Sequence, residues 1–326
     1  MHPRARAVTL LLVAALGGGC RSSERAPAPP GPGSTGSAAP AAVVDPWAPQ
    51  AQRPLDPPTV THPMARPMFW TATKGGKTTY VFGTLHLGVA ASRRIPLWVW
   101  RHFDEANTLV LEANIQDIEL VRWTLRPPGP TLRAELGDAY WAKFEAMVTP
   151  LAASFLDAQA TAVAALRASG VGGGASDQSL PMDGELLVRA QGLKKQLVFL
   201  EDARTQGALF TDLFDLGMLK RVIDHAAELA PLNPAFFDAY LAGDDARLAE
   251  LARAQFRLGV ADDAALERFL DRLLRARNQA WVAALERVAA EGGAFVAVGA
   301  LHLTGPGNVL ELLRARGFEI TRPTPP

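Results

Sequence analysis

Two histidines stand in nearly identical surroundings near the two ends of the folded part of this chain. Residues 81–88 read VFGTLHLG, and residues 297–305 read AVGALHLTG. Both segments run from an apolar, strand-like stretch into Gly-x-Leu-His, which gives His86 and His302 matching positions. Imidazole is the commonest neutral metal ligand and a usual acid–base group near pH 7. The repeat therefore predicts two similar structural halves that each deliver one imidazole to a shared place.

Two glutamates follow other predicted strands, and loops at strand ends often carry catalytic side chains. Glu112 follows the apolar run at residues 108–111, and Glu201 follows the run at residues 196–200. A carboxylate beside two imidazoles completes a common hydrolytic metal site that keeps a position open for water. A divalent ion in such a site lowers the pKa of the water and polarises a carbonyl group. Glu112 is the better candidate for the third ligand, because its strand comes directly after the first histidine motif.

A structural role for these residues stays open. A histidine at the end of a strand is often a satisfied structural residue, and the two glutamates are also candidates for surface carboxylates or helix-capping partners. The glycine of each motif allows a sharp turn or a close backbone approach. If strand geometry continues past that glycine, the Leu of each motif points to the core and the His points into a cleft.

The elements around the motifs have recognisable local patterns. Residues 68–73 and 78–82 read as β runs, and the Lys-Gly-Gly-Lys turn between them predicts a hairpin. Pro96 fits the first turn of a helix. A strand at residues 295–298 leads into the second motif, and residues 308–317 predict a capped helix before a last short strand. Each motif is therefore expected at the carboxyl end of a strand.

The middle of the chain is mostly helical. Apolar residues recur at helical spacing through most of residues 117–291, with a break at the proline-rich residues 127–130. Strand-rich pieces at both ends of a helical block predict an α+β fold. We expect two small β-containing modules, each carrying a Gly-x-x-His motif, joined by this mostly helical linker within one domain over residues 64–326.

The composition favours a globular protein and excludes several classes of partner. Of the 326 residues, 48% are hydrophobic and 20% are charged, and the formal net charge is zero. Nucleic-acid binding normally needs a basic excess, so no nucleic-acid partner is expected. The sequence contains no His-Glu-x-x-His, no Gly-x-Ser-x-Gly elbow and no phosphate-binding loop, which removes the commonest zinc protease and serine hydrolase patterns.

The first 20 residues have the layout of an export signal. Arg4 and Arg6 precede an apolar stretch at residues 8–16, which is too short for a comfortable transmembrane helix. Cys20, the single cysteine of the chain, stands at the expected processing point, which predicts a lipoprotein with lipid on Cys20. An ordinary signal peptide is the alternative, because Gly17 stands where an aliphatic residue is usual.

Residues 21–63 predict an extended spacer. They are rich in Pro, Ala, Gly and Ser, so they cannot bury enough apolar surface to offset the entropy of ordering. A spacer of this kind suits a domain held near a membrane. We therefore expect an exported protein, either periplasmic or in the outer membrane, that contacts the membrane through an N-terminal lipid anchor.

Several short sequence segments of this chain resemble the TraB/GumN family, which includes the pheromone-shutdown proteins of bacterial plasmids and the animal Tiki proteases. The segments extend over nearly all of the chain after residue 67, and the paired Gly-x-x-His motifs are the most specific of them. The matching segments are residues 81–88, 109–112, 182–186, 199–201 with Gln206, Arg277 with Asn278, and 298–317.

The resemblance implies a site built from both motifs, a Glu and an Arg. On this chain these are His86, His302, Glu112 and Arg277, with the first three as metal ligands. The Tiki members are described as metal-dependent proteases that use manganese or cobalt, which implies a divalent ion, Mn or Co. One departure is that Asp202 and Thr205 replace family residues around the Leu-Glu phrase.

Two functional hypotheses follow. The first is a metal-dependent hydrolase tethered in the cell envelope, a peptidase, in which Arg277 stabilises an oxyanion or binds a substrate carboxylate. Glu201, Gln206 and Asn278 would support the site through hydrogen bonds. The second is a non-catalytic envelope protein that captures a peptide without cleaving it. A purely structural histidine pair is a third possibility.

Overall fold

The computed structural model describes residues 57–86, 88–170 and 181–325. Cys20, the predicted signal peptide and most of the predicted spacer lie outside these residues. The described end of the spacer contacts the domain, since the backbone N–H groups of Thr61 and His62 both donate to the carbonyl of Arg93, at 3.2 Å each.

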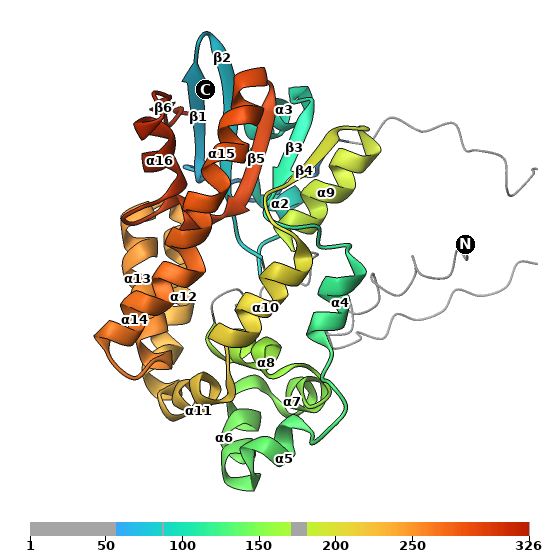
Figure 1. The fold of residues 1–326 in the computed structure, drawn as a ribbon, viewed down its shortest axis with the longest axis vertical. Helices are drawn as coiled ribbons and strands as arrows, with labels where there is room; N and C mark the ends of the chain where they lie inside the picture. Colours follow the sequence, from blue (N-terminus) through green and yellow to red (C-terminus); the bar gives the residue numbers. More distant parts are fainter. Residues whose placement is uncertain (1–56, 87, 171–180, 326) are drawn as a thin grey trace, which may run out of the picture.

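A single mixed sheet forms the upper part of the molecule in Figure 1. Its strand order is β4-β3-β5-β2-β1-β6. Strands β4, β3, β5 and β2 are parallel neighbours, whereas β1 runs antiparallel to both β2 and β6. The strands are β1 (Phe69–Lys74), β2 (Lys77–Thr84), β3 (Thr108–Leu111), β4 (Gln196–Phe199), β5 (Ala294–Gly299) and β6 (Glu319–Thr321).

The central strands are apolar because both of their faces are covered. Every residue of β3 and β5 is buried, as the continuous apolar runs TLVL and AFVAVG require for strands buried on both sides. Helix α15 crosses the front of the sheet in Figure 1, and α3 lies behind it. The α3 side packs through aromatic rings, with Phe103 5.1 Å from Phe295 and Trp98 5.3 Å from Phe69 between ring centroids.

The predicted hairpin is confirmed. Strands β1 and β2 pair from Phe69 with Phe82 to Lys74 with Lys77. The two glycines between them, at positions 75 and 76, have φ of 61° and 74°. Two successive left-handed residues are what a tight two-residue hairpin turn needs, and glycine adopts them without steric cost.

The helices fill the lower part of the molecule and flank the sheet (Figure 1). The first group is α2 (Ala91–Arg94), α3 (Leu97–Glu105), α4 (Ile118–Thr124), α5 (Leu132–Leu136), α6 (Asp138–Val148), α7 (Pro150–Leu156), α8 (Thr161–Ala168) and α9 (Met182–Gly192). The second group is α10 (Ala203–Leu213), α11 (Leu216–Asp224), α12 (Ala226–Ala242), α13 (Asp245–Gly259), α14 (Asp263–Leu270), the π turn η2 (Asp271–Arg275), α15 (Ala276–Glu291), the 3₁₀ turn η3 (Ala300–Leu303) and α16 (Val309–Ala315).

The α+β class is confirmed, and the structure refines how its parts combine. The β-containing segments from the two ends of the domain pair directly, because β2 lies beside β5 with Val81 opposite Val296 and Gly83 opposite Val298. The two predicted modules therefore share one sheet. The helical middle is interrupted by β4, as the apolar run at residues 196–200 predicted.

One helix contains two prolines in its interior. Helix α12 runs from Ala226 to Ala242 with Pro231 and Pro234 inside it. Proline inside a helix removes a backbone hydrogen bond and crowds the preceding turn. Burial of Phe236, Phe237 and Tyr240 on this helix offsets that cost.

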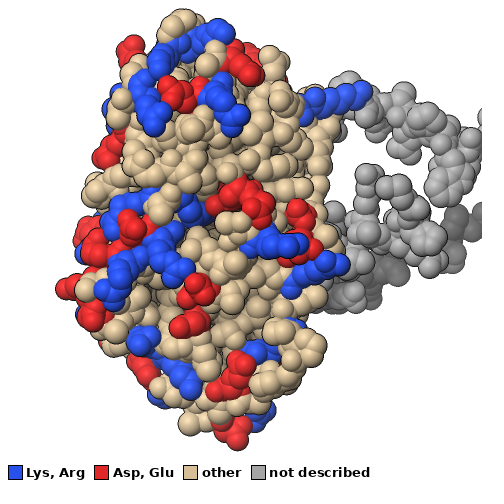
Figure 2. Space-filling model, in the orientation of Figure 1, with Lys and Arg blue, Asp and Glu red and all other residues tan. Residues whose placement is uncertain are grey.

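Among the described residues, no helix combines the length and the apolar character needed to cross a membrane. Basic and acidic side chains are interleaved over the face drawn in Figure 2. That distribution agrees with the zero formal net charge.

Candidate functional site

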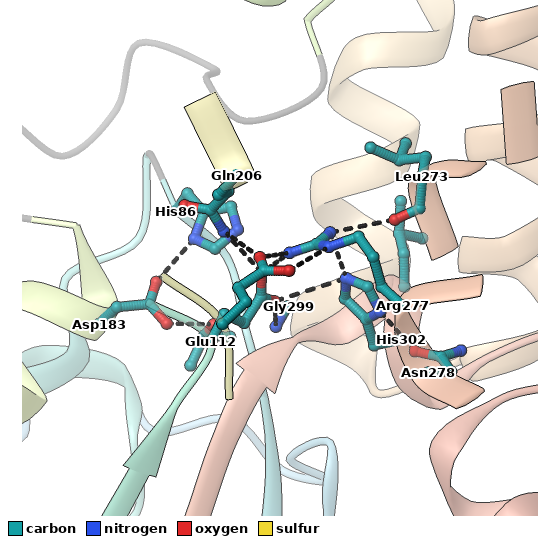
Figure 3. A network of polar contacts seen from close by, with 12 residues as sticks. His86, Glu112, Asp183, Gln206, Leu273, Arg277, Asn278, Gly299 and His302 are labelled. Atoms are coloured by element: carbon teal, nitrogen blue, oxygen red, sulfur yellow. Dashed lines mark hydrogen bonds and ion pairs between the residues drawn. The ribbon is translucent and has the colours of Figure 1, made fainter. Parts of the chain in front are cut away.

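The site lies where four parallel strands end. Strands β2, β5, β3 and β4 are neighbours in the sheet, so their carboxyl ends meet at one edge. The segments that follow them carry His86, His302, Glu112 and Glu201, respectively. Open parallel sheets commonly bind ligands at this edge. Parallel pairing of β2 with β5 is therefore what brings the two distant histidine motifs together (Figure 3).

Gly299 is the point on which three of these side chains converge. A methyl group on its α-carbon would lie 3.1 Å from Oε1 of Glu112, 3.4 Å from Nε2 of His86 and 3.6 Å from Cδ2 of His302. The backbone N–H of Gly299 also donates to Oε1 of Glu112 at 2.7 Å. The missing side chain at this position leaves the space in which the three groups approach one another.

The glycine of the first motif has a different role. A methyl group on Gly83 would lie 3.0 Å from the α-carbon of Ala300 and 3.1 Å from Cβ of Met68. The bare backbone at Gly83 thus lets the end of β2 pack against the turn η3, which holds the second motif. The two glycines are equivalent in sequence, but the first permits backbone packing and the second makes room for side chains.

His86 is the exposed member of the site, with 56% of its side chain accessible. Its Nδ1 lies 2.7 Å from Oδ2 of Asp183, and the other oxygen of that carboxylate accepts a hydrogen bond from the hydroxyl of Thr84 at 2.8 Å. A carboxylate only accepts hydrogen bonds, so Nδ1 carries a proton. The other ring nitrogen, Nε2, is the His86 atom that lies near Gly299. Desolvation alone would lower the pKa of His86, but the charge and hydrogen bond of Asp183 raise that pKa to about 9.

His302 is buried, with 3% of the residue exposed. This differs from the prediction, which placed its side chain in an open cleft. Its Nδ1 lies 2.6 Å from Oδ1 of Asn278, whose amide is oriented by donation from Nδ2 to the carbonyl of Gly307 at 3.0 Å. Nδ1 of His302 therefore carries the proton, and Nε2 accepts from Nη1 of Arg277 at 3.0 Å. Burial lowers the pKa of His302 to about 3, which keeps the ring neutral.

Arg277 links the carboxylates of the site. Its guanidinium binds Glu201 through two contacts, Nε to Oε2 at 3.1 Å and Nη2 to Oε1 at 2.5 Å. Nη2 also donates to Oε2 of Glu112 at 2.6 Å. These are charge-assisted hydrogen bonds of planar geometry, the strongest kind that side chains make. Arg277 is 8% exposed, so it is buried in the site and does not lie on a solvated helix face.

The surroundings of the two glutamates shift their pKa values in opposite directions. Burial alone would raise the pKa of Glu112, but His302, Arg277, His86 and the N–H of Gly299 hold that pKa well below its usual range. For Glu201, burial outweighs Arg277 and raises the pKa. Gln206 ties the pair together, because its Nε2 donates to Glu201 at 2.9 Å and to Glu112 at 3.3 Å.

The structure brings all seven predicted site residues of the domain together. Hydrogen bonds link six of them, and the seventh, His86, reaches the same place through Nε2, which lies near Gly299. The six are Glu112, Glu201, Gln206, Arg277, Asn278 and His302. Sequence reasoning gave no role to Asp183, although its Met-Asp phrase contributed to the resemblance. Asp183 is the second residue of α9, and only the packing of that helix against the first motif shows that it holds His86.

The tautomers of both histidines suit a metal ligand, but the arrangement of the donors does not. Each ring has Nδ1 engaged by an oxygen, which is how ligating histidines are usually held. However, the guanidinium of Arg277 is bonded to both Glu112 and His302, two of the three predicted ligands. No group of three His, Cys, Asp or Glu side chains in the described segments is arranged to hold a metal ion. In this arrangement, His86, Glu112 and His302 do not fit a divalent metal ion.

The fold and the site together define a class of α+β proteins in which two Gly-x-x-His segments meet at one edge of a mixed sheet. The family model described as the TraB/PrgY/gumN family matches residues 68–322, and the chain belongs to that family. No curated protein and no solved structure matches the chain.

Proposed function

We propose that this chain is a hydrolase that cleaves peptides and that His86 is the residue that takes the proton of the attacking water. The proposal is supported by one observation above the others. Of the seven predicted residues of the site, His86 is the exposed one, and its Nε2 faces the point at Gly299 where Glu112 and His302 converge. A proton acceptor has to be reachable by water, and His86 is.

The chemistry follows from the hydrogen bonds of His86. Asp183 holds Nδ1–H, fixes the tautomer and stabilises the imidazolium, which raises the pKa of His86 to about 9. The neutral fraction of His86 is therefore the form that accepts the proton of the water on Nε2, and the rate of cleavage should rise with pH up to about 9. The oxygen of the water would then bond to the carbonyl carbon of the substrate, and the proton on Nε2 would pass to the leaving amine as the C–N bond breaks. Thr84 fixes the Asp183 carboxylate by donating to its other oxygen.

The divalent ion and the substrate-binding role of Arg277 stay predictions of the family resemblance. No step above passes through a metal ion. The five N–H groups of Arg277 already have acceptors in this arrangement, so binding an oxyanion or a carboxylate would require one of them to be released. Metal analysis of the purified protein, with activity measured before and after chelation, tests the expected ion.

The test of the proposed hydrolysis uses a peptide mixture and mass spectrometry of the products. His86→Ala should lower the rate of cleavage by about 100- to 10,000-fold, the usual contribution of a general base. His62→Ala is the matched control, because the His62 ring is exposed and bonds to the neighbouring Thr61 hydroxyl. Equal cleavage by His86→Ala and the wild type, or no cleavage by either, would reject the proposal.

A second candidate, peptide capture without cleavage, is favoured by a different observation. Apart from His86, the charged groups of the site are largely buried and bonded to one another, which is also how a structural network is built. In that case His86 and the groups near it would orient a bound peptide. Intact recovery of a captured peptide after long incubation identifies this function, whereas fragments identify hydrolysis.

We also propose that the protein is exported and held in the envelope by lipid on Cys20, with residues 21–63 as spacer. The support is the sequence layout alone, since Cys20 lies outside the described residues. Labelling with a radioactive fatty acid tests it. Wild-type protein should be labelled and sediment with membranes, and Cys20→Ser should lose both properties. An unlabelled wild-type protein would leave the ordinary signal peptide as the correct alternative.

A further inference from the structure

The guanidinium of Arg277 is fully saturated with hydrogen bonds. Arginine has five N–H donors in a fixed plane. Nε and one Nη2 hydrogen bind Glu201, and the other Nη2 hydrogen binds Glu112. The two hydrogens of Nη1 bind the carbonyl of Leu273 and Nε2 of His302, both at 3.0 Å. Every donor has an acceptor, so the surrounding residues form a complete binding site for this cation.

Aromatic packing fixes the guanidinium in addition to its hydrogen bonds. Its central carbon lies 4.7 Å from the ring centroid of Trp281, one turn further along α15, and 5.9 Å from that of Phe210 on α10. Cations at such distances from aromatic faces are stabilised, more so when they are removed from water. Arg277 is therefore held by two carboxylates, a carbonyl, an imidazole and two rings. Figure 3 labels three of these partners, Glu112, Leu273 and His302.

The same cation uses the donor atoms that a metal ion would need. Oε2 of Glu112 and Nε2 of His302 are both committed to the guanidinium. The buried cluster contains two carboxylates, Glu112 and Glu201, and a neutral His302, so a single positive charge from Arg277 already compensates much of its negative charge. A divalent ion added beside Arg277 would meet a buried, permanently charged group of the same sign.

We propose that Arg277 is the resident cation of this site and occupies the position in which Glu112 and His302 would otherwise hold a divalent ion. The guanidinium thus suppresses metal binding in the wild-type chain, and removal of its charge converts the same donors into a metal site. The inference does not depend on hydrolysis, because metal binding is measured without substrate.

The experiment titrates Mn²⁺, Co²⁺ and Zn²⁺ into the full chain by calorimetry, with metal content checked after dialysis. Arg277→Met keeps an unbranched stem on Trp281 but removes the charge and the five donors. This variant should bind one equivalent, tighter than the wild type by at least about 100-fold, as the loss of a like charge at contact range implies. Binding should disappear again when His302→Ala is added to Arg277→Met.

Two further variants make the result specific. Arg272→Met removes a charge of the same helical segment whose partner is the exposed Asp212, and it should bind metal as weakly as the wild type. Arg277→Lys keeps the positive charge and should also bind weakly. Circular dichroism establishes that each variant is folded.

The proposal is overturned by tight, stoichiometric binding to the wild type that is lost in Glu112→Gln. It is equally overturned by a folded Arg277→Met that binds no metal. If Arg277→Met does not fold, the wild-type titration still decides, since the proposal requires that saturating Mn²⁺, Co²⁺ or Zn²⁺ leave the thermal midpoint of the wild type unchanged. A metal-dependent rise in that midpoint that His302→Ala abolishes would contradict it.

Discussion

The hydroxyl of Tyr240 donates a hydrogen bond to the backbone carbonyl of Gly83 at 2.8 Å, and both groups are buried. Tyr240 comes from helix α12 in the helical part of the domain, whereas Gly83 begins the first histidine motif at the end of β2. The same hydroxyl lies 3.3 Å from the sulfur of Met182, the residue before Asp183. The helical part thus anchors both the motif and the helix that holds His86.

Removal of this hydroxyl should destabilise the fold. Tyr240→Phe keeps the ring but leaves the buried carbonyl of Gly83 without its partner, which costs about 1–3 kcal/mol of unfolding free energy. Urea denaturation measures the change. Tyr140→Phe is the control, because its hydroxyl bonds to Asp224 near the surface and should cost less. Equal stability of the two variants would show that the Tyr240 contact contributes nothing specific.

The two motif glycines should respond differently to alanine. Gly299→Ala places a methyl group among Glu112, His86 and His302, so peptide cleavage or capture should be lost while unfolding changes by about 1–3 kcal/mol. Gly83→Ala instead meets backbone at Ala300 and should mainly lower stability. Activity and thermal unfolding of both variants separate the effects. A fully active Gly299→Ala would mean that the convergence point has no functional importance.

The charge of His86 should depend on Asp183. An NMR titration of the wild type should place the pKa of His86 near 9, and Asp183→Asn should lower it toward the ordinary value of 6.5. The folded pKa is raised above the unfolded value, so the ion pair stabilises the fold below pH 6.5 and this contribution is lost as pH rises through about 9. A wild-type midpoint near 6.5 would show that Asp183 does not hold the imidazolium.

Breaking the buried ion pair should cost far more than breaking a surface pair. Glu112→Gln leaves Arg277 without one of its two carboxylates and should lower the unfolding free energy by about 3–5 kcal/mol. Glu286→Gln, whose partners Lys74 and Arg316 are both about half exposed, should change it by less than about 1 kcal/mol. Chemical denaturation compares them. Similar losses in both would contradict the buried character of the network.

Local patterns in the sequence predicted the strands that carry the site. The alternation and the Gly-Gly turn of the first hairpin, the apolar runs of β3 and β5 and the cap of α16 are determined by nearby residues, and the structure confirms each of them. Glu112 was found because it directly follows β3. These features needed no knowledge of which strand lies beside which.

Strand pairing and helix packing could not be predicted in the same way. Nothing local indicates that β2 lies beside β5, so two modules were expected where one sheet exists. Asp183 was missed because it reaches His86 only after α9 packs against the first motif. Several arginines lie along residues 262–290, a pattern typical of a solvated helical face, and nothing local distinguishes Arg277 among them. The decisive difference is its burial against Glu112 and Glu201.

The place of β5 in the sheet has a consequence for how the chain matures. This strand lies between β3 and β2, yet it is synthesised after nearly all other elements, at residues 294–299. Contacts between such distant segments form late, since a long loop must close first. A growing chain therefore carries His86 and Glu112 without the strand that unites them. A fragment that stops before residue 294 lacks β5, Gly299 and His302, so the other site residues have no point on which to converge.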